Sequence, residues 1–161
     1  MGERNIETAK QMGQEAIVKE VVINATPAKV WKMLTVPELM SQWMGEPEMQ
    51  LSVITDWQSG GSVVIRGINP LPFESTGKII VFEPEQLLGY SHLSSLSGLA
   101  DEAQNYTLLL FEVKPVGEQT QLSLTLSNFP TEIIFKHFDL YWNGTLTVLK
   151  SFAEQQVDSI S

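Results

Sequence analysis

The clearest pattern in the chain is an alternation of apolar and polar residues over residues 119–127. A period of two is typical of a β-strand with one buried face and one face in solvent. The segment before it, residues 105–113, shows a similar alternation, and the turn-forming sequence KPVGEQ separates the two. The pair predicts an antiparallel hairpin. Its inward side chains are expected to be Leu109, Phe111, Val113, Leu122, Leu124 and Leu126.

Other apolar segments bounded by turn residues predict the rest of a sheet. The first, residues 15–25, is rich in valine and isoleucine. Four more follow at residues 49–57, 62–67, 76–83 and 86–93. Gly60-Gly61 and the sequence EPE predict hairpins, and the proline-bearing residues 68–75 form a further connection.

Two short helices are predicted between the first strand and the second. Thr26 is a favourable N-cap, and Pro27 occupies the first helical position, where its missing N–H is tolerated. Pro37 interrupts the helix, and a second turn or two reaches Met44.

A long helix is predicted over residues 131–156, where apolar residues recur every three to four positions. A helix of about 26 residues would span roughly 40 Å and would cross the whole sheet. Gly144 lies inside this helix, and we expect it to mark a close approach to another backbone. His137 is expected to face water.

These elements predict an α+β fold over residues 15–157, preceded by a disordered lead over residues 1–14. The expected arrangement is a curved antiparallel sheet of about seven strands, with the long C-terminal helix across its concave face. One helix covers a curved sheet incompletely. We therefore expect a hollow between the sheet and the helix.

Composition narrows the classes of partner. Ten basic and nineteen acidic residues give a formal net charge of −9, which opposes binding to nucleic acid and to anionic membranes. The chain contains no cysteine, which excludes disulfides and thiolate chemistry. No apolar run reaches the length of a membrane span and no apolar signal core is seen, so we expect a cytoplasmic location.

Several segments together resemble one family. They are INATPAKVWKMLTVPELMSQWM, SGGSVVIRG, TGKIIVFEPEQLLGYSH, TQLSLTLSNFP and YWNGTLTVLKSF, and they cover most of residues 16–156. In order and spacing the sequence resembles the START-like, helix-grip (SRPBCC) superfamily, and within it the Aha-type domains named after the activator of a heat-shock protein's ATPase. The resemblance implies a helix-grip fold with a cavity for apolar small molecules. It also implies that some relatives carry out cyclase- or aromatase-like reactions.

Aromatic and methionine side chains are the first candidates for the wall of this cavity. Trp43, Met44 and Trp57 either fill the core or border the mouth of a cavity. Phe138 and Trp142 on the long helix face the sheet in both cases. The full set of predicted cavity residues is Trp43, Met44, Trp57, Arg66, Tyr90, His92, Tyr106, Leu109, Phe111, Phe138 and Trp142.

Four of these side chains carry the candidate chemistry. Tyr90 and Tyr106 are included because a buried phenol requires a polar partner, which a ligand can supply. Arg66 either lies on the solvent face or pairs with a neighbour such as Glu74 or Glu112, or it points inward as an anchor for a carboxylate. His92 is either an exposed or satisfied side chain or a proton donor or acceptor in the cavity.

No metal-ligand set, nucleophile elbow or phosphate loop is recognisable, so neither a metal nor a cofactor is predicted. The leading hypothesis is that the protein binds a small apolar or amphipathic molecule between the sheet and the long helix. The first alternative is a polyketide-cyclase-like enzyme that uses Tyr90, His92 or Arg66 to handle protons. The second is a domain that regulates a chaperone ATPase, which rests on the resemblance alone. Self-association into a homodimer is left open.

Overall fold

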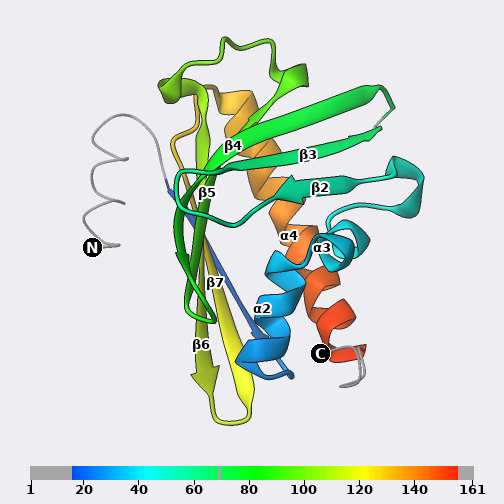
Figure 1. Cartoon of the computed structure of the whole chain (residues 1–161), viewed down its shortest axis with the longest axis vertical. Coiled ribbons are helices and arrows are strands. Elements are labelled where there is room, and N and C mark those ends of the chain that lie inside the picture. The colour runs from blue at the N-terminus through cyan, green and yellow to red at the C-terminus, as the bar shows by residue number, and fades with distance from the viewer. Residues whose placement is uncertain (1–15, 69, 156–161) are drawn as a thin grey trace.

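The computed structural model of the chain describes residues 16–68 and 70–155. It contains a seven-stranded sheet with the order β1-β7-β6-β5-β4-β3-β2, in which neighbouring strands are antiparallel. The strands are β1 (Ile17–Ile23), β2 (Ser52–Thr55), β3 (Ser62–Ile68), β4 (Pro72–Glu83), β5 (Leu87–Ser94), β6 (Thr107–Val116) and β7 (Gln119–Ser127). The sheet curves around the long C-terminal helix (Figure 1), which confirms the predicted α+β fold. The predicted lead over residues 1–14 lies outside the described residues.

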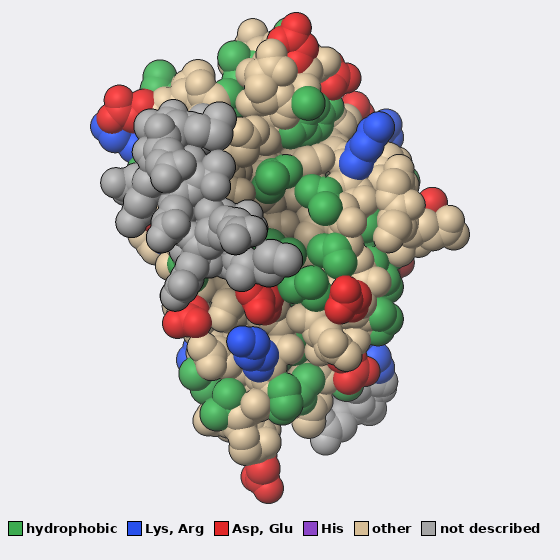
Figure 2. Space-filling model, turned by 90° about the vertical axis from the view of Figure 1, so that its left-hand side faces the viewer, with side chains coloured by type: hydrophobic (Ala, Val, Ile, Leu, Met, Phe, Trp, Pro, Cys, Tyr) green, Lys and Arg blue, Asp and Glu red, His purple; other side chains and the backbone are tan. Residues whose placement is uncertain are grey.

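The hairpin of β6 and β7 has the predicted register. Leu109 lies opposite Leu126, Phe111 opposite Leu124 and Val113 opposite Leu122. All six side chains face inward, and the most exposed of them, Val113, has an exposed fraction of 4%. Figure 2 shows the outer face of the sheet, where apolar side chains lie scattered between charged ones. One face of the sheet is therefore buried, and the other face is exposed to solvent.

Two short helices, α2 (Pro27–Thr35) and α3 (Pro37–Trp43), follow β1 as predicted. The Thr26 hydroxyl accepts a hydrogen bond from the Lys29 N–H at 3.2 Å and thereby caps α2. Val36 ends α2 and is also the N-cap position of α3, because Pro37 cannot continue the first helix. The pair covers one end of the sheet.

The long helix α4 (Glu132–Gln155) lies across the concave face (Figure 1). Its buried face contains Phe138, Trp142, Leu146, Leu149 and Ala153, which recur every three to four positions. Among the described residues, no helix is long and apolar enough to cross a membrane.

The expectation for Gly144 is wrong. A Cβ atom added at this position would meet no atom within 4 Å, so the glycine faces open space. Gly144 lies on the exposed side of α4.

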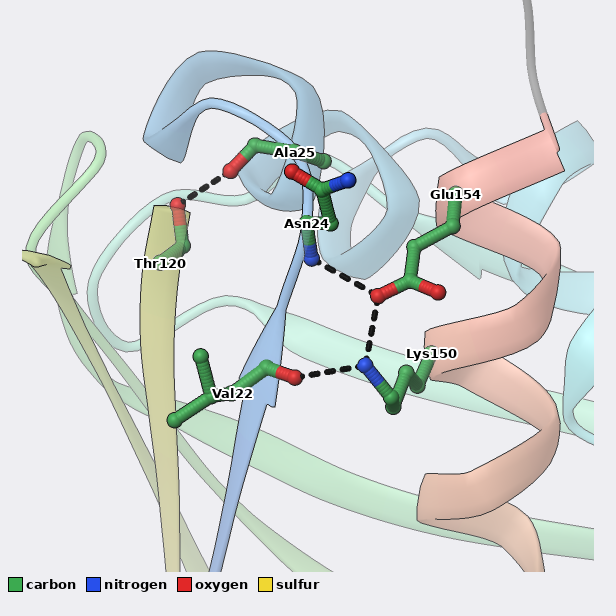
Figure 3. A network of polar contacts seen from close by, with 6 residues as sticks. All are labelled: Val22, Asn24, Ala25, Thr120, Lys150 and Glu154. Atoms are coloured by element: carbon green, nitrogen blue, oxygen red, sulfur yellow. Dashed lines mark hydrogen bonds and ion pairs between the residues drawn. The ribbon is translucent and has the colours of Figure 1, made fainter. Parts of the chain in front are cut away.

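Polar contacts fix the C-terminal half of α4 to the edge strand β1 (Figure 3). The Lys150 ammonium donates a hydrogen bond to the Val22 carbonyl at 2.8 Å, and the Asn24 N–H donates one to Glu154 Oε2 at 2.7 Å. Lys150 and Glu154 also form an ion pair. The helix thus satisfies backbone groups that an edge strand would otherwise leave unpaired.

Strand β4 begins earlier than predicted. Pro72 and Phe73 pair with Ile68 and Gly67 of β3, so the proline-bearing connection is part of the sheet. Proline is tolerated at the first residue of a strand, where its missing N–H removes no essential ladder bond. The extension matters for function because it brings Phe73 and Ser75 alongside the hollow.

Candidate functional site

A cavity of about 580 Å³ lies between the sheet and the N-terminal half of α4. Strands β3 to β6 form its floor, α4 forms its roof, and residues 95–105 and the segment after α3 border it at the sides. The lining residues are Met44, Met49, Leu51, Ile65, Phe73, Ser75, Tyr90, His92, Leu93, Ser94, Leu96, Ser97, Asn105, Thr107, Leu109, Thr131, Ile133, Ile134, His137, Phe138, Tyr141 and Trp142.

The floor of the cavity is built from cross-strand pairs. Tyr90 of β5 lies opposite Leu109 of β6, and His92 lies opposite Thr107. Because residues two apart on a strand share a face, Tyr90 and His92 both reach the same side of the sheet. The strand register therefore brings two ionisable side chains together on one wall.

The roof of the cavity is one face of the first turns of α4. Ile134, Phe138 and Tyr141 lie on this face, at the spacing of neighbours along a helix. The Tyr141 hydroxyl donates a hydrogen bond to the Met44 carbonyl, which joins the roof to the segment after α3. Exposed Ile133 and Leu96 border the opening.

The other half of the interior is filled. Leu146, Leu149 and Ala153 of α4 belong to the same packed core as Val30 of α2 and Leu122 of β7. The most exposed of these five side chains is Leu146, with an exposed fraction of 5%. The hollow is consequently confined to one end of the molecule.

Tyr90 is a buried phenol that faces the cavity. Its ring packs against Phe111 with centroids 6.2 Å apart and against Trp57 at 6.3 Å. No described residue forms a hydrogen bond with its hydroxyl. Burial, with a smaller contribution from Tyr141, raises the pKa of Tyr90 well above its ordinary value. The hydroxyl is thus a neutral donor over the physiological range of pH.

His92 is held in its neutral form. Its ring contacts Phe138 edge-on, with centroids 5.3 Å apart. Burial, and then the nearby His137, lower the pKa of His92 from 6.5 to about 4. At neutral pH the imidazole can donate and accept a hydrogen bond, but it carries no charge.

Trp142 contributes a second donor without a partner. The ring is 2% exposed and packs edge-on against Phe111 with centroids 5.7 Å apart. Its indole nitrogen is buried and has no hydrogen-bond partner among the described residues. Such groups are rare in folded proteins.

Some of the predicted site residues line the cavity and some do not. Those that line it are Met44, Tyr90, His92, Leu109, Phe138 and Trp142. Trp43 and Phe111 lie behind this wall as core residues that are 3% and 1% exposed. The Trp43 indole donates a hydrogen bond to the Met33 carbonyl at 2.8 Å, so its polar atom is already satisfied.

Three further predicted residues lie away from the cavity. Arg66 points to the outer face of β3, where its Nε lies 2.6 Å from Oε2 of Glu74 on the neighbouring strand. Trp57 packs beside the cavity wall and donates its indole N–H to the Thr35 carbonyl. Tyr106 donates its hydroxyl to Asp101 at 2.6 Å on the surface.

Several lining residues were not predicted. Some come from the segment after α3 and from the loop between β5 and β6, which have no periodic pattern that would indicate the direction of a side chain. Others, such as Ser75 of β4, Leu93 of β5 and Tyr141 of α4, lie in regular elements. His137 is exposed, as expected, but it also borders the cavity, where it stacks on Tyr141 with centroids 6.2 Å apart. Its position one helical turn before Tyr141 was the available signal.

Within the described ranges, no three His, Asp or Glu side chains lie where they would hold a metal ion. What the site offers chemically is an apolar surface with a phenol, an imidazole and an indole N–H.

The comparisons with known proteins agree with this architecture, which is that of an Aha-type START-like domain. The sequence matches the family described as activator of Hsp90 ATPase homolog 1-like protein over residues 24–154. Because this match spans most of the chain, the protein belongs to that family. No curated protein sequence gives a significant match.

Solved structures share the fold. A protein of Cytophaga hutchinsonii is 32% identical, with 88% of this chain and 94% of that chain covered and a TM-score of 0.73. The Aha1 dimer from Colwellia psychrerythraea is 20% identical, with 87% and 96% covered and a TM-score of 0.69. CalU16 from Micromonospora echinospora is 19% identical, with 87% and 76% covered and a TM-score of 0.65, so these last two show the fold alone.

Proposed function

We propose that the protein binds a small apolar or amphipathic molecule in the cavity under α4. The observation that carries this proposal is the cavity of about 580 Å³ at one end of an otherwise packed core. Sites for small molecules commonly have volumes of about 300–1,000 Å³ and mostly apolar walls. An unfilled apolar space loses dispersion contacts, which an apolar ligand would restore.

The polar groups in the wall support the proposal. Tyr90 is a buried side chain whose hydroxyl forms no hydrogen bond with a described residue, and the buried Trp142 indole nitrogen has no acceptor among them. A ligand with one polar end would satisfy a donor and fill the apolar space together. A few well-placed polar groups among apolar ones are the usual means of fixing a ligand's orientation.

Native mass spectrometry of the purified protein, with a library of lipophilic compounds in thermal-shift assays, tests this function. We expect one-to-one adducts and a higher midpoint of unfolding, because a ligand that binds only the folded state stabilises it. No adduct and no shift with any compound would contradict the proposal.

A homodimer is a second proposal, which one surface of α4 favours. Ile133, Leu140 and Val148 are 79%, 76% and 49% exposed and lie on one outer stripe of the helix, together with Gly144. The stripe contains no acidic residue, and the one charged side chain beside it between Ile133 and Leu140 is the basic Lys136, so a second copy can approach it in spite of the net charge of −9. The Colwellia psychrerythraea relative is described as a dimer.

Light scattering after size exclusion tests the dimer. We expect Leu140→Glu to yield a monomer, because it places two like charges in the interface, whereas Ile54→Glu on the outer face of β2 should leave the dimer intact. Wild-type protein that is monomeric at high concentration would contradict the proposal.

The cyclase-like reaction, the chaperone-regulating role and the cytoplasmic location stay predictions.

A further inference from the structure

The side chains in the wall of the cavity indicate which ligands it accepts. Among the described residues, those that line the cavity include serine, threonine, asparagine, tyrosine and histidine, but no Lys, Arg, Asp or Glu. Interior walls seldom carry unpaired charges, and a wall without charge limits the ligands that the cavity can accept. We propose that the cavity selects uncharged ligands that carry a hydrogen-bond acceptor, such as an ester or ketone, and excludes carboxylates and ammonium ions. This inference rests on the proposed binding function.

The first step concerns desolvation. A carboxylate or an ammonium group that enters a mostly apolar cavity loses its hydration, and this loss is large unless an opposite charge is present. The wall supplies no such charge among the residues described. For an anion the net charge of −9 adds a repulsive long-range field.

The second step concerns the basic residues close to the wall. Arg66 follows the lining residue Ile65 directly, but alternation along β3 turns it to the opposite face, where it pairs with Glu74. On the side of α4, Lys19 is bound to Asp139 at 2.7 Å and to Asn143. Neither cation is directed to the ligand space.

The third step concerns the histidines. His92 is surrounded by Phe138 and His137 of α4 and by Thr107 of β6, none of which is an acid that would favour an imidazolium. Burial and the neighbouring His137 together hold the pKa of His92 at about 4, so this side chain offers no positive charge at neutral pH.

The fourth step concerns the kind of polar group that the cavity accepts. The Tyr90 hydroxyl faces the cavity and has no partner among the described residues, and burial keeps it protonated because it raises the pKa of the phenol. The Trp142 indole is a donor only, and it too has no described partner. The Trp142 nitrogen is fully buried in the wall, so the Tyr90 hydroxyl is the donor that reaches the cavity, and it matches a ligand with a carbonyl or ether oxygen.

Displacement of Nile red, a neutral dye, from the full chain near neutral pH tests the inference. The competitors are methyl decanoate, decanol, decanoate and decyltrimethylammonium, which share one alkyl chain and differ in the charge of the head. We expect the ester and the alcohol to bind at least about tenfold more tightly than either ion. Binding of decanoate or of the ammonium ion with the affinity of the ester would overturn the inference alone. Binding of none of the compounds, including the dye, would overturn the proposed function and the inference with it.

A charge placed at the opening sharpens the test. Leu96 is 54% exposed and lines the cavity, so Leu96→Arg is compatible with folding and puts a guanidinium beside the ligand. We expect this variant to bind decanoate at least about tenfold more tightly than wild type, with the ester unchanged. Ile54→Arg, at a 51% exposed position of β2 outside the lining set, has the same net charge and should leave the selectivity unchanged. Equal gains in the two variants would assign the effect to net charge and overturn the inference.

The role of the Tyr90 donor is tested separately. Tyr90→Phe keeps the ring contacts with Phe111 and Trp57 and removes only the hydroxyl. We expect methyl decanoate to bind about three- to tenfold more weakly, whereas Nile red affinity changes less. Unchanged affinity for the ester in Tyr90→Phe, with wild-type folding, would contradict the part of the inference that concerns the acceptor.

Discussion

At the scale of single residues, His92 links the hollow interior to the stability of the fold. Its pKa is about 4 in the folded protein and 6.5 in an unfolded chain, because burial and His137 disfavour the charged ring. Between these two values the unfolded state binds more protons than the folded state. The stabilising contribution of neutral His92 is therefore fully present above pH 6.5, and it is lost as the pH falls towards 4.

We expect the unfolding free energy to fall by at most about 3 kcal/mol across that interval because of His92. Urea unfolding at a series of pH values measures the slope. His92→Gln should remove most of the slope in this interval, whereas His137→Gln should retain most of it, since burial is the larger cause of the shift. An unchanged slope in His92→Gln would show that other groups cause it.

Two glycines provide an opposed pair of predictions. A Cβ at Gly77 would lie 1.6 Å from the Ser91 carbonyl oxygen, a backbone atom of the adjacent strand. Gly77→Ala must therefore separate β4 from β5, and we expect a loss of at least about 3 kcal/mol. Gly144→Ala meets no neighbour and restricts the unfolded chain, so it should stabilise by about 0.5–1 kcal/mol. Urea midpoints measure both, and a loss in Gly144→Ala would contradict the open surroundings of that residue.

How far single residues could be predicted depends on how regular their segment is. The prediction for Arg66 was open between the two faces and counted it among the cavity residues, although alternation along 62–67 places it on the face opposite Ile65. Trp43 and Met44 could not be separated in the same way, because they end a short, proline-interrupted helix. Trp43 is held by its bond to Met33 and Met44 reaches the cavity, and this difference depends on packing against elements distant in the sequence.

At the scale of elements, the position of α4 depends on polar contacts with β1. Lys19 is 12% exposed, lies 2.7 Å from Asp139 and also donates to Asn143, so it joins the first strand to the middle of the helix. We expect Lys19→Met, which keeps most of the side chain's volume, to lower the unfolding free energy by about 1 kcal/mol. Denaturant unfolding measures the change.

Lys136 provides the matched control for this prediction. It pairs with Glu132 within α4, and the two side chains are 73% and 79% exposed. Lys136→Met removes the same charge from a solvated pair, and its effect should stay below about 0.5 kcal/mol. Equal losses in the two variants would mean that Lys19 acts through net charge and not through its contact with the helix.

The elements themselves were largely predictable, since the sequence patterns have clear periods. The alternation in 119–127 and the three-to-four spacing in 131–156 match β7 and α4 closely. The start of β4 was missed because Pro72 was taken as part of a connection, although proline can begin a strand. The loop between β5 and β6 has no period, so its contribution to the cavity wall could not be read from the sequence.

At the scale of the whole molecule, the interior is uneven. A curved sheet under one straight helix was expected to leave a hollow. Which end stays hollow depends on side-chain volumes that meet only in the folded chain. The core residues of α2, β1 and β7 fill one end, while Ser75, Thr107 and His92 at the other end are too small or too polar to do so. The periodicity of the sequence indicates which side chains point into the interior and which point to solvent. It does not indicate whether the inward side chains are large enough to fill the space between the sheet and α4.

One substitution made at both ends of the sheet distinguishes a hollow end from a filled one. Leu109→Phe extends a lining side chain into free space, so it should change the unfolding free energy by less than about 1 kcal/mol. Leu122→Phe adds the same volume at a position that is 0% exposed within the packed core, and overpacking there should cost about 1–3 kcal/mol. Leu109→Phe should also weaken Nile red binding by at least about tenfold, because the ring occupies the ligand space. Urea unfolding and dye titration of the two variants measure these effects. If Leu109→Phe destabilised the protein as strongly as Leu122→Phe, the space under the first turns of α4 would be filled in solution, and the ligand site could not lie there.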